Sequence, residues 1–384
     1  MTEKLYYIDS HLHEFTARVL SCVPWGEGYA LTLDRTAFFP EGGGQPGDSG
    51  RVGPARVLDT HEKDGEVLHY TDMAFEPGTE VACAVDWEQR LRRMQNHSGE
   101  HIVSGIAHKL HGVENVGFHM GEECMTVDFD AVLSWEELMR IEQLANEAVR
   151  ANVPVRATFP TRTELAALDY RSKLELTENV RIVAIEGIDL CACCAPHVSR
   201  TGEIGVIKIL DAQKHRGGVR ISILCGMDAI EDYRRRQEDV TAVSRLLSAK
   251  RDGVPGAVER LLGERDGFKA RAAELSLRAV ELMAESFPCR EGNICVFDDL
   301  LDEIALRELV NRLVPKCTGL AAVFFPAGEG WRYIIGSGRV DLRANARAIN
   351  AGISGRGGGS PVMIQGQAFG SEADIRSFIE AFNV

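Results

Sequence analysis

The spacing of apolar residues changes at residue 87, and this change most constrains how the chain can fold. Before it, Thr16–Leu20, Tyr29–Leu33 and Thr79–Val85 alternate apolar and polar residues between glycines and prolines, as short strands do. After it, apolar residues recur every three or four positions, which predicts a helix that begins near Trp87. The chain therefore predicts a small N-terminal β-barrel followed by a region of mixed helices and strands.

The remaining patterns divide the chain further. A second helix is expected over Ser134–Asn152, since Ser134 and Glu137 form a capping-box pattern. Two charged helices are expected on either side of a break at Gly253–Gly256. The pair could form an antiparallel hairpin, a dimer contact or a linker packed on its own domain. We expect an α+β multidomain fold with an N-terminal β-barrel over residues 1–87, an α+β domain over 88–226, a helical hairpin or coiled-coil linker over 227–287 and a C-terminal α/β domain that ends in a glycine-rich loop and a helix over 288–384.

Charge and hydropathy exclude some classes of protein. The 384 residues include 57 acidic and 43 basic side chains, a net charge of −14, so any contact with nucleic acid must be local. Apolar stretches such as Gly319–Phe325 are far shorter than the ~20 residues that a membrane-spanning helix needs. The polar start of the chain lacks the apolar segment of a signal peptide. We expect a soluble cytoplasmic protein that does not contact a membrane.

Two histidines four residues apart, His97 and His101, lie on the predicted helix that follows the barrel. Side chains at this spacing share one helical face and can bind a single metal ion. Far downstream, Cys193 and His197 offer a thiolate and a third imidazole. Three imidazoles and a thiolate suit Zn²⁺ better than Mg²⁺ or Ca²⁺, which prefer oxygen ligands. The sequence therefore predicts a zinc site formed by these four residues.

The choice of cysteine stays open, because Cys191, Cys193 and Cys194 lie together. We choose Cys193 for its spacing to His197. The three thiols also permit a redox dithiol, although no pair has the Cys-x-x-Cys spacing of thioredoxin-type sites. Four protein ligands are typical of structural zinc, whereas catalytic zinc keeps one position open. We therefore expect one ligand, His197, to bind weakly or to give way.

A glycine-rich segment, Phe39–Asp48, contains three consecutive glycines followed by Gln45. The glycines permit an unusual backbone path close to a ligand, and a hairpin loop would explain them equally well. Gln45 is an uncharged donor and acceptor, which could orient a water molecule or a carbonyl group.

A second glycine-rich segment lies near the C-terminus. Residues Trp331–Pro361 contain five arginines and one aspartate in an otherwise acidic chain. Arginines beside loop amides predict a contact with phosphate or the RNA backbone, and a solvated helix face is the alternative. The candidate residues are Arg339, Arg343, Arg347, Arg356, Gly357, Gly358 and Gly359.

These motifs together resemble those of one family. His97-Ser-Gly-Glu-His101 and Cys193–Gly205 resemble the two-part zinc signature of alanyl-tRNA synthetase editing domains and of their free-standing AlaX relatives. Phe39–Asp48 resembles the glycine motif of that family, and Gly357–Pro361 resembles the C-terminal DHH-associated domain of its long form. The resemblance implies a zinc-dependent hydrolase that acts in trans, without ATP, on tRNA(Ala) mischarged with serine or glycine. It thus implies a role in translation fidelity.

The resemblance also implies roles for individual residues. Gln45 would position water or the carbonyl group, and Ser98 would contact the side chain of the amino acid. Ser98 stands where the family commonly has threonine, and Cys193–His197 replaces the usual Cys-Gly-Gly-Thr-His. The C-terminal candidate residues would bind the tRNA, and a homodimer would form through the helical linker or the C-terminal domain.

Two other classes of function compete with this interpretation. His97-Ser-Gly-Glu100-His101 matches the His-x-x-Glu-His motif of inverted zinc peptidases, in which Glu100 would act as general base. A non-catalytic RNA-binding module could instead use the zinc only to join the helix to the Cys193 segment. The sequence leaves the order of preference between serine and glycine open.

Overall fold

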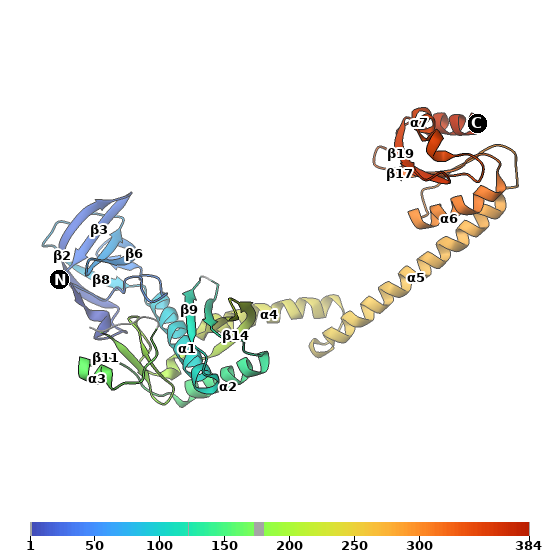
Figure 1. Cartoon of the computed structure of the whole chain (residues 1–384). Helices are drawn as coiled ribbons and strands as arrows, with labels where there is room; N and C mark the ends of the chain where they lie inside the picture. Colours follow the sequence, from blue (N-terminus) through green and yellow to red (C-terminus); the bar gives the residue numbers. More distant parts are fainter. Residues whose placement is uncertain (1, 122, 173–179, 384) are drawn as a thin grey trace. The chain divides into compact units, whose positions relative to one another are not determined.

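The computed structural model describes residues 2–121, 123–172 and 180–383 (Figure 1). The chain forms two compact units, Met1–Asp239 and Val240–Val384, and each is described by itself. Across the described residues, no helix combines the length and the apolar character needed to cross a membrane. The predicted mixture of helices and strands is confirmed, and the division into four domains stays a prediction.

Six strands near the N-terminus close into a barrel in the order β2-β3-β7-β6-β5-β8, with every neighbouring pair antiparallel. Their bounds are β2 Glu14–Trp25, β3 Gly28–Leu33, β5 Gly50–Val52, β6 Ala55–Lys63, β7 Glu66–Thr71 and β8 Glu80–Val85. Alternate side chains such as Val19, Leu31 and Val57 fill the interior, because successive side chains of a strand point to opposite faces. The strands predicted within β2, β3 and β8 are confirmed.

The rest of the first unit is built around α1 (Trp87–His111). Its other main elements are β9 Asn115–Met120, β10 Met125–Phe129, α2 Trp135–Ala151, β11 Val155–Thr158, α3 Arg162–Ala166, β12 Ile182–Ile185, β13 Asp189–Ala192, β14 Ile207–His215 and β15 Gly218–Cys225. The predicted start of α1 and the Ser134 capping box of α2 are confirmed. Both helices share one core with the sheet β14-β15-β10-β9. Gly99 permits the close approach, since a Cβ there would lie 2.3 Å from Cys225 Sγ.

Two helices, α4 (Gly226–Leu246) and α5 (Val254–Ser286), follow this sheet, and α5 has Pro255 in its first turn. The predicted pair of helices and the break between them are confirmed. Leu261, Phe268 and Leu275 of α5 are more than half exposed. Formation of a hairpin or a homodimer through this segment stays a prediction.

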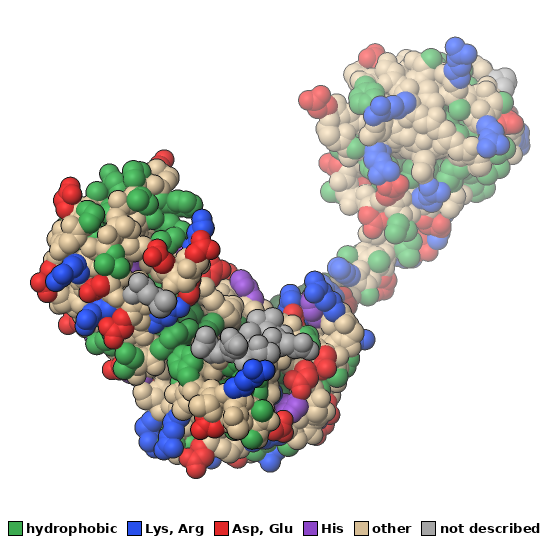
Figure 2. Space-filling model, turned by 60° about the vertical axis from the view of Figure 1, so that its left-hand side comes forward, with side chains coloured by type: hydrophobic (Ala, Val, Ile, Leu, Met, Phe, Trp, Pro, Cys, Tyr) green, Lys and Arg blue, Asp and Glu red, His purple; other side chains and the backbone are tan. Residues whose placement is uncertain are grey.

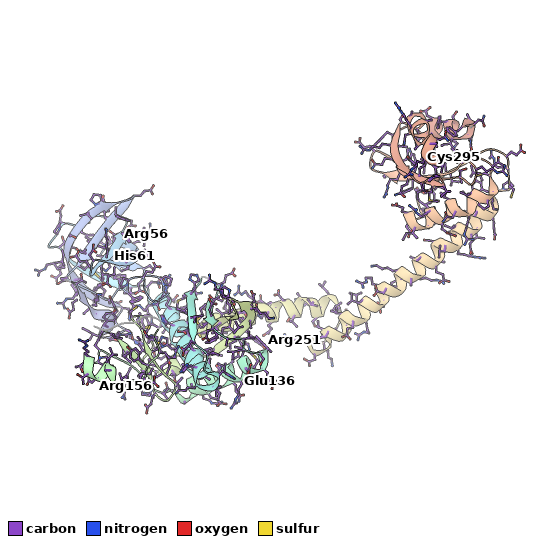
Figure 3. The ribbon with its side chains drawn as sticks, in the orientation of Figure 1. Arg56, His61, Glu136, Arg156, Arg251 and Cys295 are labelled. Atoms are coloured by element: carbon purple, nitrogen blue, oxygen red, sulfur yellow. The ribbon has the colours of Figure 1, made fainter. Side chains whose placement is uncertain are left out.

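The second unit contains a five-stranded sheet in the order β16-β17-β18-β20-β19. Its elements are β16 Ile294–Phe297, α6 Glu303–Leu313, β17 Ala321–Ala327, β18 Gly330–Gly336, α7 Leu342–Gly352, β19 Gly355–Gly359, β20 Met363–Ala368 and α8 Glu372–Ala381. One face of the sheet packs on α7 and α8, and the other on α6 and the end of α5. Cys295 is buried in β16 (Figure 3), as expected for a cysteine that serves as a small hydrophobic residue.

The predicted C-terminal glycine-rich loop is wrong, because Gly357–Gly359 belong to the edge strand β19, which pairs with β20. Gly357 is required because the neighbouring atoms leave no room for a side chain. A Cβ on Gly357 would lie 2.3 Å from both the Tyr333 hydroxyl and the Gln365 carbonyl oxygen, so only glycine lets β19 approach this closely.

This packing can be tested with two neighbouring glycines. Gly357→Ala should lower the free energy of unfolding by about 1–3 kcal/mol, because the added methyl group overpacks the sheet. Gly358→Ala is the matched control, since a Cβ there meets no atom within 4 Å. Thermal unfolding followed by circular dichroism measures both, and equal melting temperatures for the two variants would contradict the packing argument.

Candidate metal centre and adjoining pocket

Helix α1 brings His97 and His101 to the same buried face. Asp86 caps its N-terminus by accepting a hydrogen bond from Gln89 N–H, and Gly112 ends it in the left-handed conformation. The intervening 25 residues form an uninterrupted helix, so the two imidazoles lie one turn apart. Both histidines are 2% exposed.

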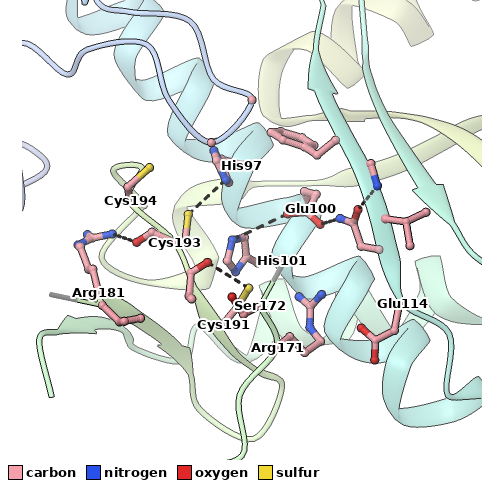
Figure 4. Close-up of a pocket in the computed structure, with 18 of the residues that line it drawn as sticks. His97, Glu100, His101, Glu114, Arg171, Ser172, Arg181, Cys191, Cys193 and Cys194 are labelled. Carbon is pink, nitrogen blue, oxygen red and sulfur yellow. Dashed lines mark hydrogen bonds and ion pairs between the residues drawn. The ribbon is translucent and has the colours of Figure 1, made fainter. Parts of the chain in front are cut away.

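Cys193 and His197 follow β13 and meet the two histidines of α1. Figure 4 shows Cys193 beside His97 and His101. The Cys193 Sγ atom lies 3.5 Å from His97 Nε2 and 3.4 Å from His197 Nε2. All four potential ligand atoms, including one from His101, lie within 4.8 Å of one another. Tetrahedral zinc, with its usual bond lengths to sulfur and nitrogen, would separate such atoms by about 3.6 Å. The four residues therefore fit a zinc ion.

Each imidazole is held from behind through its Nδ1 atom. His97 Nδ1 lies 3.0 Å from Gln45 Oε1, His101 Nδ1 lies 3.0 Å from Asp189 Oδ2, and His197 Nδ1 lies 3.0 Å from Ser98 Oγ. The Gln45 and Asp189 oxygens accept these hydrogen bonds, so Nδ1 of His97 and His101 carries the proton and Nε2 is left to bind a metal. Partners of this kind fix the ring orientation in known metal sites.

The electrostatics of the cluster favour a thiolate at Cys193 and a neutral ring at His197. His101 differs: burial lowers its pKa, but Cys191, Asp189 and Cys193 outweigh this effect and hold it well above its usual range. Burial raises the pKa of the Cys193 thiol, but the imidazoles of His97 and His197 outweigh this effect and hold it well below its usual range. Burial lowers the pKa of His197 to about 3, so its imidazole is neutral. Burial would raise the pKa of Asp189, but hydrogen bonds from His101 and Arg171 lower it to about 2. Thiolate and neutral imidazole are the forms that bind zinc.

The structure separates the three cysteines that the sequence left open. Cys193 belongs to the four-residue group with the histidines, whereas Cys191 lies with His101 and Asp189. Burial raises the thiol pKa of both Cys191 and Cys194 to about 11, so both remain protonated at neutral pH. The geometry therefore favours Cys193 as the ligand.

A pocket of about 480 Å³ opens beside the cluster (Figure 4). His97, His101 and Cys193 line it, whereas His197 does not. Glu100 also lines the pocket and is only 4% exposed, and its carboxylate accepts hydrogen bonds from Ser104 and Asn115. Its burial means that Glu100 does not face solvent, and the four-residue group contains no carboxylate ligand of the kind that completes a peptidase site.

The glycine segment before Gln45 is anchored to α1 by a buried ion pair. Arg90 is fully buried, and its guanidinium group donates hydrogen bonds to Asp48 and to the carbonyl oxygens of Ser10 and Ala37. Asp48 also accepts a hydrogen bond from Phe39 N–H. This network holds the loop so that Gln45 reaches His97.

Gln45 and Ser98 both lie in the cluster, but neither lines the pocket. Both side chains are fully buried, and each contacts an imidazole ring. Ser98 Oγ also accepts a hydrogen bond from Val198 N–H. The structure therefore places these two residues behind the candidate ligands rather than at the pocket wall where sequence reasoning expected them to act.

The arginine candidates belong to the second unit. Arg339, Arg343, Arg347 and Arg356 are all exposed, and Arg343 and Arg347 lie one turn apart on α7. Figure 2 shows basic side chains in blue on the surface of this unit. Their contact with RNA stays a prediction.

The chain is similar in sequence to several known proteins. The family described as threonyl and alanyl tRNA synthetase second additional domain matches residues 180–222, the stretch that contains Cys193 and His197. The alanyl-tRNA editing protein AlaX-L of Pyrococcus horikoshii is 31% identical over 285 residues, which cover 72% of this chain and 70% of that protein. This chain belongs to the AlaX family. The resemblance found in the sequence motifs is thereby confirmed.

Longer relatives of this AlaX family member are alanine–tRNA ligases. The ligase of Natronomonas pharaonis is 34% identical over 100% of this chain, and that of Pyrobaculum neutrophilum is 32% identical over 99% of it. The aligned regions are 43% and 44% of those two ligases. The chain thus spans less than half the length of these relatives.

Sequence reasoning missed the groups that support the site. Neither the periodicity nor the spacing of the sequence pointed to Asp189 or Asn115. Asp189 hydrogen-bonds His101, and Asn115 hydrogen-bonds Glu100. Tyr7, Phe159 and Arg181 on the pocket wall were missed for the same reason. Their roles depend on contacts between segments that are far apart in the sequence.

The choice among the cysteines predicts a difference in metal content. Cys193→Ala should abolish zinc binding, because it removes the one sulfur ligand of the four-residue group. Cys194→Ala should leave the metal content unchanged, and it is the matched control because its thiol lies one residue away. Elemental analysis of the purified variants measures this, and zinc retained by Cys193→Ala would contradict the assignment.

Proposed function

We propose that this protein is a zinc-dependent hydrolase that removes serine, glycine or both from mischarged tRNA(Ala) in trans. One observation carries the proposal: three of the four candidate ligands, His97, His101 and Cys193, line one pocket in a member of the AlaX family. The pocket volume lies within the range of sites that enclose small-molecule ligands.

The chemistry of ester hydrolysis suits this ligand set. A bound zinc ion would polarise the ester carbonyl or lower the pKa of a water molecule to about 7. His97, His101 and Cys193 would hold the ion at the pocket wall. His197 lies off the pocket, and we propose that it is the ligand that binds weakly, so that the ion could accept a substrate oxygen on the pocket side in its place.

Gln45 and Ser98 act in this proposal as positioning residues. Gln45 Oε1 and Ser98 Oγ fix the rings of His97 and His197 with Nε2 toward Cys193. Both side chains would thus influence hydrolysis indirectly, by orienting the histidines that bind the metal. Residues behind the ligands have this role in other metal sites.

Selection of the amino acid would depend on the polar part of the pocket. Glu100 and Asn115 line it, and the Glu100 carboxylate is suited to the ammonium group of an aminoacyl ester. A site that hydrogen-bonds a hydroxyl group discriminates more strongly than one that senses a methyl group, which is worth about 1–3 kcal/mol. Glycine would enter because it is small.

The second candidate is an RNA-binding module in which zinc is structural. Four protein ligands in one group favour it, because closed tetrahedral sites usually stabilise a fold. In that case the pocket would bind no ester, and the protein would bind tRNA without changing it.

Incubation with Ser-tRNA(Ala) and Gly-tRNA(Ala) separates the two candidates. The purified protein should release the amino acid, and both a zinc chelator and Cys193→Ala should reduce release to the spontaneous rate. Cys194→Ala should remain active. Release is measured from labelled serine or glycine on the tRNA.

Tight tRNA binding without loss of the ester would favour the RNA-binding module. Cleavage of a peptide substrate that is lost on Glu100→Gln would instead support the peptidase. Either result would contradict the proposed hydrolase.

We further propose that the exposed arginines of the second unit bind the tRNA backbone. Replacing Arg339, Arg343 and Arg347 with glutamine should flatten the dependence of affinity on salt by up to roughly 0.9 per lost phosphate contact in a plot of log affinity against log salt. In the control, Arg265, Arg271 and Arg278 of α5 are replaced with glutamine. These three arginines form exposed ion pairs, and their replacement removes the same amount of charge. Filter binding at several salt concentrations measures the slope, and equal slopes would exclude this surface.

A further inference from the structure

One wall of the pocket contains two aromatic rings and an arginine that the proposed chemistry does not use. Tyr7, Phe159 and Arg181 all line the pocket beside Cys193. They come from three separate segments: the turn that precedes the barrel, the residue after β11, and the residue before β12.

The three side chains form a continuous series. The rings of Tyr7 and Phe159 meet edge to face with their centroids 5.4 Å apart. The Arg181 guanidinium carbon lies 5.3 Å from the centre of the Tyr7 ring. Arg181 Nη1 then donates hydrogen bonds to the carbonyl oxygens of Cys193 and Ala195. The series thus runs from an exposed ring to the backbone of a candidate metal ligand (Arg181 and Cys193 in Figure 4).

Two features of this wall indicate a ligand rather than packing alone. Phe159 is 53% exposed although it borders a pocket, so much of its surface is free to contact a bound group. Arg181 is 7% exposed and lines the same pocket as a buried cation. An exposed aromatic ring beside a cation is suited to a planar aromatic ligand.

We propose that Tyr7, Phe159 and Arg181 form the subsite for the 3′-terminal nucleoside of the aminoacyl-tRNA. This inference rests on the proposed function and deepens it. The base would stack on the exposed Phe159 ring and meet the Tyr7 ring at its edge, since stacking on aromatic side chains is how proteins commonly bind unpaired bases. Arg181 would contribute its positive charge to this wall while its Nη1 holds the Cys193 segment in place.

The subsite would orient the substrate across the pocket. With the base on the aromatic wall, the ester that follows the ribose would be directed toward Cys193 and the histidines. The wall therefore explains how the site could distinguish an ester on tRNA from a free amino-acid ester, which lacks a base.

Binding of a non-hydrolysable analogue tests the subsite without requiring catalysis. The probe is 3′-deoxy-3′-serylamido-adenosine, measured by isothermal titration with the full chain. Phe159→Leu should weaken its binding by about 5- to 150-fold, the range found for loss of one base-stacking ring. Phe159→Tyr should preserve binding, because it keeps an aromatic face. Trp25→Ala, an exposed aromatic residue of the barrel, is the control that should change nothing.

A second measurement separates this proposal from the proposed function. Phe159→Leu should raise the KM for Ser-tRNA(Ala) with little change in kcat, and should raise the KM for serine methyl ester by less, because that ester has no base to stack. Equal affinity of wild-type and Phe159→Leu protein for the analogue would overturn the subsite. If the wild-type protein binds the analogue through these rings but hydrolyses no ester, the subsite stands and the hydrolase proposal fails.

Discussion

The first unit depends on one interaction, the contact of the Cys193 thiolate with imidazole rings from two distant parts of the chain. Helix α1 supplies two rings and the segment after β13 supplies the sulfur and the third ring. A buried thiolate is costly unless cationic or hydrogen-bonding groups compensate it. The same groups that compensate it form a ligand set for zinc, so the arrangement that stabilises this centre is also the one suited to chemistry.

The support of this centre extends well beyond its four residues. The buried Arg90–Asp48 ion pair attaches the glycine segment to α1, and Gln45 on that segment holds His97. Removing one partner of such a pair would leave an uncompensated charge in the interior. Asp189 and Ser98 hold the other two rings. Barrel, helix and sheet therefore all help to hold the candidate ligands, and none of them contains the centre alone.

Much of the architecture could be predicted from local pattern. The period of two in β2, β3 and β8, the start of α1 and the Ser134 cap each depend on neighbouring residues, and each was found as expected. The loop predicted at Gly357–Gly359 was wrong. Glycine runs are typical of turns, but here the absence of a Cβ permits an edge strand to pack closely on Tyr333. That reason is visible only when both strands are in place.

The sequence by itself determined which side chains could bind a metal, since ligand chemistry belongs to the residue type and a spacing of four places two histidines on one helical face. Spacing already favoured Cys193, but only the tertiary structure grouped its sulfur atom with the three imidazoles and placed Gln45 and Ser98 behind the rings. It alone assembled Tyr7, Phe159 and Arg181 on one wall. The physical reason is that such contacts join segments many residues apart, and their formation depends on how whole elements pack rather than on any local signal.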